Sequence, residues 1–307
     1  MLKRLNIYFK EMYPLIPRLF LGMLVFLEIY FIVFCNSGKT IADITAMPWQ
    51  NFVGMAVCGF TIFSFLCWLR IADDFKDYEL DRRLFAERAL PSGRVYKSDL
   101  RWALGFIVLS STILNFMYMN NFYWFLFLYI YGTLMALWFF QKSKIQNSLP
   151  LALITHNPVM MVLNIYIITF VCYKYELPLL SWPTFLLAFT MYFPSLIWEV
   201  SRKIRAPKEE TEYVTYSKLF GYQRATTFVR NLTLLDIVTN VFLLWNISRI
   251  GVIILLANVI WMTIQFQQYI ADPTRFSLKA RVERYTYITE ATMVLAVVWH
   301  LILLSVS

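Results

Sequence analysis

Charged residues are scarce in this sequence of 307 residues: Asp, Glu, Lys and Arg together make up only 15% of it. So little charge, beside 59% hydrophobic residues, excludes an ordinary soluble domain and predicts a polytopic membrane protein. The four cysteines form no CxxC pair, so we expect apolar packing residues and not a disulfide framework or metal ligands. No linker or second soluble segment is apparent, and the sequence predicts one helical membrane domain over 1–307.

Long apolar runs define the predicted architecture, an all-α protein with nine transmembrane helices. About 20 apolar residues are needed to cross the hydrocarbon core as a helix. Runs of this kind occur at 19–35, 50–70, 102–118, 122–140, 149–173, 183–199, 232–247, 250–269 and 285–305.

The basic residues predict the orientation of these spans, because cytoplasmic loops are enriched in Lys and Arg. With the N-terminus inside, 25 of the 28 Lys and Arg residues fall in cytoplasmic segments, and only Lys39, Lys174 and Arg249 fall outside. Nine spans then place the C-terminus on the opposite side. We interpret the net charge of +9 as a consequence of this topology and of contact with anionic membrane lipids, not as nucleic-acid binding.

Four aspartates follow the second predicted span directly, in the segment DDFKDYELD (73–81). On a helix Asp74, Asp77 and Asp81 are spaced i, i+3 and i+7, so the spacing predicts that they share one face. Carboxylates that close repel unless a cation lies between them, and Mg²⁺ takes carboxylate oxygens while keeping positions for phosphates. A solvated acidic helix end is the alternative interpretation.

A basic loop comes next, and Pro91-Ser92-Gly93 within it is a turn signal. Basic side chains beside an acidic metal site suit a polyanion such as diphosphate, because metal and arginine can neutralise different oxygens.

These residues resemble a known family. Asp73-Asp74-x-x-Asp77-x-x-x-Asp81-Arg82 and the later Arg88-Ala89-Leu90-Pro91-Ser92-Gly93-Arg94 are similar to the first aspartate-rich motif and the following loop of the UbiA superfamily of intramembrane prenyltransferases. Asp73 stands where that family usually has Asn, and Ala89 where it usually has Pro.

The resemblance implies nine helices around a central cavity with a cytoplasmic cap, and Mg²⁺-dependent transfer of an isoprenoid chain from a prenyl diphosphate to a small or lipidic acceptor. It also implies that Asp74, Asp77 and Asp81 ligate Mg²⁺ and that Asp73 assists them. Lys142 matches a basic position that the family tends to carry. The cations expected to hold diphosphate are Arg88, Arg94, Lys142, Arg202 and Lys203.

The second cytoplasmic loop departs from the family pattern, since only Glu199 stands where a second acidic motif is expected, and we predict it to be a further metal ligand. Thr215 to Gly221 resembles the stretch that follows that motif. The basic cluster Arg202, Lys203 and Arg205 is open to two interpretations. Either it binds diphosphate in place of a second metal, or it is a membrane anchor while an acid at 209, 210 or 212 supplies ligands.

Three polar residues within spans are candidates for the cavity or the acceptor. His156 and Asn157 precede Pro158, which interrupts the fifth span and frees backbone groups to line a cavity. Asp236 lies near the inner end of the seventh span, with Asn240 one turn on, and ionisable groups at membrane depth are costly enough to suggest function. For each of them, a packed, hydrogen-bonded structural role is the alternative.

Other functions stay open at this point. A UbiA-type terpene cyclase would use the chain's own double bond as acceptor, and the altered second loop also admits polyprenyl-phosphate glycosyl transfer of the phosphoribosyl kind. A transporter or scaffold without catalysis is the alternative from another class.

Overall fold

The computed structural model describes residues 1–39, 42–43 and 49–306, and within them all regular structure is helical. Helix accounts for 79% of the chain, and the described residues include no strand. This confirms the all-α class. A helix is favoured here because the hydrocarbon core offers no water to backbone N–H and C=O groups, which a helix pairs within the segment.

Eight helical segments among the described residues are long and apolar enough to cross a membrane. They are Leu15–Asn36, Phe52–Lys76, Lys97–Tyr118, Leu149–Lys174, Trp182–Ser201, Tyr222–Leu244, Arg249–Ala271 and Leu278–Leu304. The predicted span at 122–140 corresponds to α7 (Phe122–Ala136), whose 15 residues extend about 22 Å, against roughly 30 Å of hydrocarbon. Nine spans, the orientation of the termini and the cytoplasmic cap therefore stay predictions.

The chain divides into two compact units. Unit 1 comprises the described residues of Met1–Leu27, Met47–Lys142 and Tyr173–Glu176, and unit 2 those of Glu28–Ala46, Ser143–Cys172 and Leu177–Ser307. The single domain predicted over 1–307 stays a prediction.

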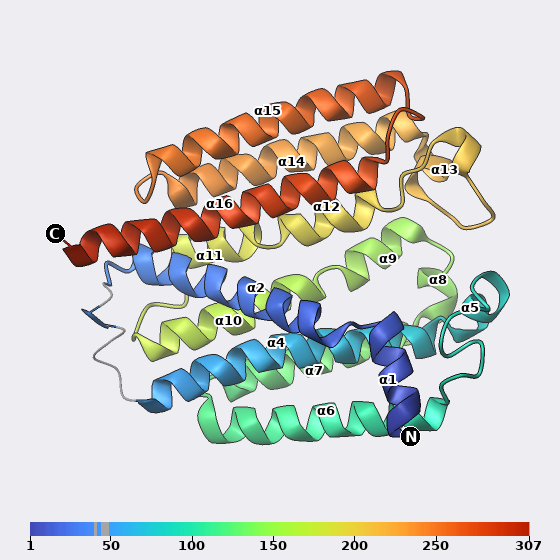
Figure 1. Cartoon of the computed structure of the whole chain (residues 1–307), viewed down its shortest axis with the longest axis horizontal. Helices are drawn as coiled ribbons and strands as arrows, with labels where there is room; N and C mark the ends of the chain where they lie inside the picture. The colour runs from blue at the N-terminus through green and yellow to red at the C-terminus, as the bar shows by residue number, and fades with distance from the viewer. Residues whose placement is uncertain (40–41, 44–48, 307) are drawn as a thin grey trace. The chain divides into compact units, whose positions relative to one another are not determined.

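In unit 1, α4 packs against both α6 and α7, and the short α1 lies against α6 (Figure 1). Its elements, besides the start of α2 (Leu15–Asn36), are α1 (Leu2–Glu11), α4 (Trp49–Lys76), α5 (Tyr78–Leu84), α6 (Lys97–Tyr118), α7 and the short turn η1 (Trp138–Phe140).

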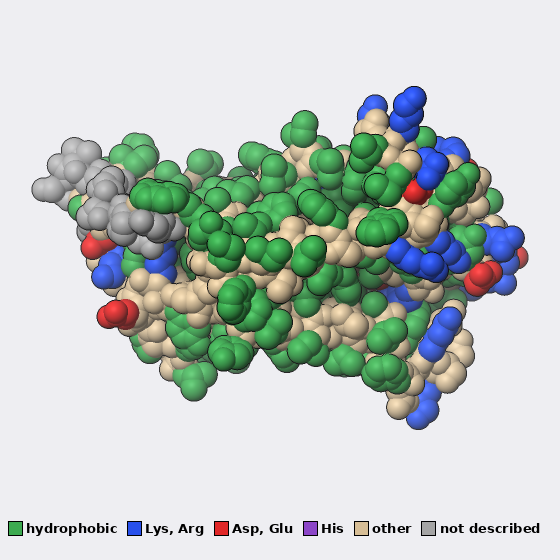
Figure 2. Space-filling model, turned by 90° about the horizontal axis from the view of Figure 1, so that it is seen from below, with side chains coloured by type: hydrophobic (Ala, Val, Ile, Leu, Met, Phe, Trp, Pro, Cys, Tyr) green, Lys and Arg blue, Asp and Glu red, His purple; other side chains and the backbone are tan. Residues whose placement is uncertain are grey.

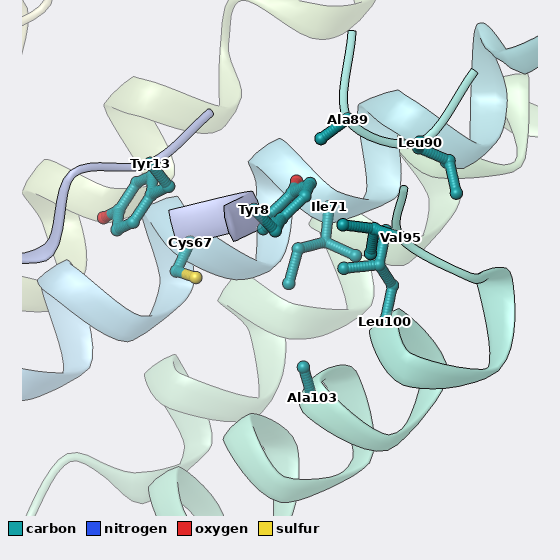
Figure 3. Close-up of a cluster of buried hydrophobic side chains, with 9 residues drawn as sticks. All are labelled: Tyr8, Tyr13, Cys67, Ile71, Ala89, Leu90, Val95, Leu100 and Ala103. Carbon is teal, nitrogen blue, oxygen red and sulfur yellow. The ribbon is translucent and has the colours of Figure 1, made fainter. Parts of the chain in front are cut away.

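A cluster of buried side chains fixes the N-terminal segment and the basic loop onto α4 and α6 (Figure 3). Tyr8 and Tyr13 come from the N-terminal segment, Ile71 from α4, and Leu90 and Val95 from the loop. Cys67, Ala89, Leu100 and Ala103 complete the cluster. Burial of a large apolar side chain contributes roughly 1.5–3 kcal/mol. The loop after the aspartates is therefore held in place by its own apolar residues.

In unit 2, α14, α15 and α16 run side by side, and α12 packs against α14 and α16 (Figure 1). The helices are α8 (Lys142–Ile145, most of it in this unit), α9 (Leu149–His156), α10 (Val159–Lys174), α11 (Trp182–Thr190), α12 (Phe193–Ser201), η2 (Pro207–Glu209), α13 (Tyr216–Phe220), α14 (Tyr222–Leu244), α15 (Arg249–Ala271) and α16 (Leu278–Val306). The interruption predicted at Pro158 is confirmed, because α9 ends at His156 and α10 begins at Val159.

Figure 2 shows hydrophobic side chains across the middle of the visible face, while the visible Lys, Arg, Asp and Glu side chains gather toward its left and right margins. Trp102, Phe106 and Phe116 on α6 are each more than 70% exposed, as expected of side chains that face lipid. This distribution supports an integral membrane protein.

Candidate functional site

The aspartate segment lies at the junction of two helices. α4 ends at Lys76, α5 begins at Tyr78, and Asp77 between them has φ −99° and ψ 9°. Helical hydrogen bonds nevertheless continue across the junction, since the N–H of Asp77 donates to the carbonyl of Asp73 and that of Asp81 to the carbonyl of Asp77, each at 2.9 Å. The predicted helical register is therefore kept with a local distortion at Asp77.

Asp74 is 4% exposed and is held by two partners. Arg70, one turn earlier, donates to its Oδ1 at 2.7 Å, and the hydroxyl of Tyr8 from α1 donates to its Oδ2 at 2.6 Å. A buried charge needs such compensation. The N-terminal helix thus reaches directly into the aspartate segment.

Asp81 is 6% exposed and forms an ion pair with Arg88 of the basic loop. Nη1 of Arg88 donates to both carboxylate oxygens, at 2.9 and 2.8 Å, and the guanidinium lies 4.0 Å from the centre of the Phe85 ring. This pair joins the basic loop to the aspartate segment. Both of its residues belong to the predicted site.

Asp73 pairs with Lys76 at 2.7 Å, and the Lys76 ammonium lies 4.9 Å from the centre of the Trp138 ring. Trp138 belongs to η1, whose three residues Trp138, Phe139 and Phe140 all have positive φ. This backbone region is costly for residues other than glycine. The turn after α7 therefore places the Trp138 ring against the ammonium of Lys76, which pairs with Asp73.

Arg94 lies just after the predicted turn, which is confirmed by the positive φ of 76° at Gly93. Its guanidinium pairs with Glu11 of α1 and donates to the carbonyl of Glu87 at 2.6 Å. The hydrogen bond from Arg94, together with its charge, holds the pKa of Glu11 below the usual value. The pair is exposed, so its contribution to stability is small. Lys142 is exposed at the start of α8.

These contacts bear on the predicted magnesium site. Asp74, Asp81 and Asp73 each face a cation of the chain, and within the described residues no three His, Cys, Asp or Glu side chains lie close enough together to hold a metal. The convergence of aspartates that the spacing predicts is therefore not the arrangement found.

The donor chemistry still fits Mg²⁺, because Asp74 and Asp81 are buried carboxylates, a ligand type that Mg²⁺ takes. Binding there requires Arg70 and Arg88 to release oxygens that they now hold. The metal role of these aspartates stays a prediction.

Glu199 on α12 binds both cations of the second loop. Arg202 pairs with its Oε2 at 2.6 Å and Lys203 with its Oε1 at 2.9 Å. The Glu199 side chain is 20% exposed and that of Lys203 only 13%, so the cluster is half-buried. It combines two positive charges with one negative charge and keeps a surplus of hydrogen-bond donors.

The other acids of this loop are arranged differently. Glu210 accepts hydrogen bonds from the hydroxyls of Thr215, at 2.8 and 2.7 Å, and Ser217. Glu209 and Glu212 are exposed. Glu210 therefore closes the loop on itself, and both interpretations of the basic cluster stay predictions.

The candidates within the spans are hydrogen-bonded. The Asn157 amide donates to the Tyr192 hydroxyl at 3.0 Å, and Nδ1 of His156 lies 2.9 Å from the Thr155 hydroxyl.

Asp236 lies in the middle of α14 and not near the inner end of its span, because the helix begins at Tyr222. It is 1% exposed and accepts from Asn240 at 2.8 Å and from Tyr285 at 3.0 Å. This geometry favours the interhelical, structural alternative for Asp236.

Sequence reasoning missed α1 altogether. Besides Tyr8 and Glu11, this helix carries Arg4, whose Nε and Nη2 bind Asp99 of α6 at 2.6 and 2.9 Å. The signal was present: apolar residues recur at helical spacing at Leu5, Tyr8 and Met12, as in an amphipathic helix that packs on one face.

The long apolar helices define an integral membrane protein of the all-helical class. The structure resembles that of a digeranylgeranylglyceryl phosphate synthase studied in membranes, with a TM-score of 0.63 and 13% identity, over 96% of this chain and 99% of that one. At this identity the likeness shows the fold alone, and this fold agrees with the one that the predicted resemblance implies. No protein-family model matches the chain, and no curated protein matches its sequence.

Proposed function

We propose that the chain is an intramembrane prenyltransferase that transfers an isoprenoid chain from its diphosphate to an acceptor in the membrane. The observation that carries this proposal is the fold likeness to a membrane prenyltransferase over nearly the whole chain. The aspartate segment and its basic loop support it, because they bring buried carboxylates and arginines together at the end of an apolar helix.

In this proposal Asp74, Asp77 and Asp81 hold Mg²⁺ and Asp73 assists them. Glu199 of the second loop is proposed as a further metal ligand. When bound, the metal would neutralise phosphate oxygens of the leaving group. The cations proposed to bind phosphate oxygens are Arg88 and Arg94 of the basic loop, Lys142, and Arg202 and Lys203 of the second loop. Charge-assisted hydrogen bonds of this kind fix the orientation of the diphosphate.

The chemistry is a substitution at the allylic carbon. The C–O bond to diphosphate breaks, the electron pair stays on the phosphate oxygen, and the acceptor forms the new bond and loses a proton. Donors placed where negative charge develops stabilise the transition state. Exclusion of water by the surrounding apolar helices protects the allylic cation from hydrolysis.

Turnover of two double variants tests the role of the second loop in this function. Arg202→Gln with Lys203→Gln should lower turnover by orders of magnitude, since each donor to a developing anion is worth about 2–4 kcal/mol.

The matched control is Glu209→Gln with Glu212→Gln, which also changes the charge by two but at exposed positions. It should leave turnover and the Mg²⁺ requirement unchanged. A sharp rise in the Mg²⁺ requirement of the control, with normal turnover of the basic pair variant, would show that the acids and not the cations serve the site.

A further inference from the structure

Tyr216 is held in a fixed position within the second loop. It is the first residue of α13, and its backbone N–H donates to the carbonyl of Lys203 at 2.9 Å. The residue is 5% exposed. This backbone hydrogen bond joins the segment of Tyr216 to the segment that carries Arg202 and Lys203.

The hydroxyl of Tyr216 is buried and has no hydrogen-bond partner among the residues that the structure describes. Buried polar groups are almost always paired, and one left unpaired destabilises the fold. Phe would fill the same space without that penalty. An unpaired phenol at a buried position is therefore best explained by a partner that is not part of the chain.

The surroundings of this hydroxyl indicate the chemistry of that partner. Burial, and next the negative charge of Glu199, raise the pKa of Tyr216 well above its usual value, while Arg202 opposes this. The phenol therefore keeps its proton and can donate. The guanidinium of Arg202 and the ammonium of Lys203 are further donors of this loop, and both are bonded to Glu199.

We propose that the Tyr216 hydroxyl donates a hydrogen bond to a phosphate oxygen of the prenyl diphosphate, beside Arg202 and Lys203. This inference rests on the proposed function and adds a binding residue to it. The side chain of Arg202 is 38% exposed, so an anion can reach its guanidinium. The net positive charge of the cluster favours an anion over a cation as ligand.

Tyr216→Phe tests the proposal, with Tyr213→Phe in the same loop as matched control. The full chain is purified into lipid nanodiscs, and calorimetry measures the dissociation constant of inorganic diphosphate. A hydrogen bond to a charged group should make binding about 10- to 100-fold weaker in Tyr216→Phe. The control should bind as the wild type does.

The melting temperature of the ligand-free protein provides the second readout. Tyr216→Phe should melt at the same temperature as the wild type or higher, because it removes an unpaired buried group. A lower melting temperature would overturn the proposal, because it would show that the hydroxyl has a partner within the chain. An unchanged dissociation constant for diphosphate would also overturn it, because the hydroxyl would then not contact the ligand. Weaker binding of glycerol phosphate alone would also overturn it, since the contact would then belong to a phosphorylated acceptor.

Failure of the proposed function gives a different pattern. If wild-type protein binds diphosphate, and Tyr216→Phe weakens that binding, but no prenylated product forms from any donor, then transfer fails and the phosphate contact stands. If product forms and Tyr216→Phe has the wild-type KM for the prenyl diphosphate, the contact fails and transfer stands.

Discussion

Tyr8→Phe removes one hydroxyl from the aspartate segment and leaves the rest of the N-terminal helix in place. The phenol donates to Asp74 at 2.6 Å, while the ring packs in the apolar cluster with Ile71 and Leu100 (Figure 3). Burial, and next the Asp74 carboxylate, raise the pKa of Tyr8 well above its usual value, so the donor is present throughout the neutral pH range. The change therefore deletes a hydrogen bond without deleting apolar packing.

The expected loss follows from the chemistry of that bond. A hydrogen bond to a charged group contributes about 1.5–3 kcal/mol, and Asp74 keeps Arg70 at 2.7 Å after the change. With an unfolding entropy of about 2.1 cal/mol/K per residue, such a loss lowers the melting temperature by about 2–5 °C. If Asp74 is a metal ligand, loss of the group that orients it should also raise the Mg²⁺ concentration needed for turnover about 10- to 100-fold.

Thermal unfolding in nanodiscs and a Mg²⁺ titration of turnover measure the two effects. The control is Tyr123→Phe on α7, whose residue is 85% exposed and whose hydroxyl should not matter. Wild-type melting of Tyr8→Phe would refute the claim that α1 is anchored on Asp74. A lower melting temperature with an unchanged Mg²⁺ requirement would show that Asp74 is not a metal ligand.

Three further predictions follow from the same arrangement. Asp77→Asn should abolish Mg²⁺-dependent turnover while the protein melts normally, and full activity would refute a metal role for this residue. Because Arg94 lowers the pKa of Glu11, the pair should stabilise α1 above the usual Glu pKa of about 4.3 and lose this effect as the pH falls through the lower, folded-state value. Hydrogen exchange of α1 in Glu11→Gln should then lack the wild-type increase below about pH 4. Cysteine tags at Phe85 and Glu176 should react from opposite sides of the membrane, and reaction from the same side would contradict the predicted topology.

The sequence was sufficient for the all-helical class, for eight of the nine predicted spans and for the turn at Gly93, because these depend on local hydropathy and backbone preference. The ends of the helices were harder to predict from the sequence. The hydropathy pattern placed the start of the seventh span at residue 232, whereas α14 begins at Tyr222. Arg224 and Arg230 lower the hydropathy of that turn, yet long basic side chains can reach the water boundary from a continuing helix.

Some contacts of the candidate site could not be predicted from the spacing of neighbouring residues. The pairs Arg70 with Asp74 and Lys76 with Asp73 have helical i+4 and i+3 spacing and could have been expected. The contact from Tyr8 spans 66 residues of sequence and exists only because α1 packs on the cluster around Ile71. The spacing of the aspartates alone does not reveal the cations that pair with Asp73, Asp74 and Asp81.

The most direct test of the central claim is product analysis on the full chain in nanodiscs. The protein is incubated with Mg²⁺, a panel of prenyl diphosphates and its co-purified lipids, and mass spectrometry follows both products. The account predicts equal amounts of released diphosphate and of a prenylated membrane acceptor, with neither from Asp74→Asn combined with Asp81→Asn. Intact donors with folded wild-type protein, or a cyclised isoprenoid with no acceptor attached, would contradict it.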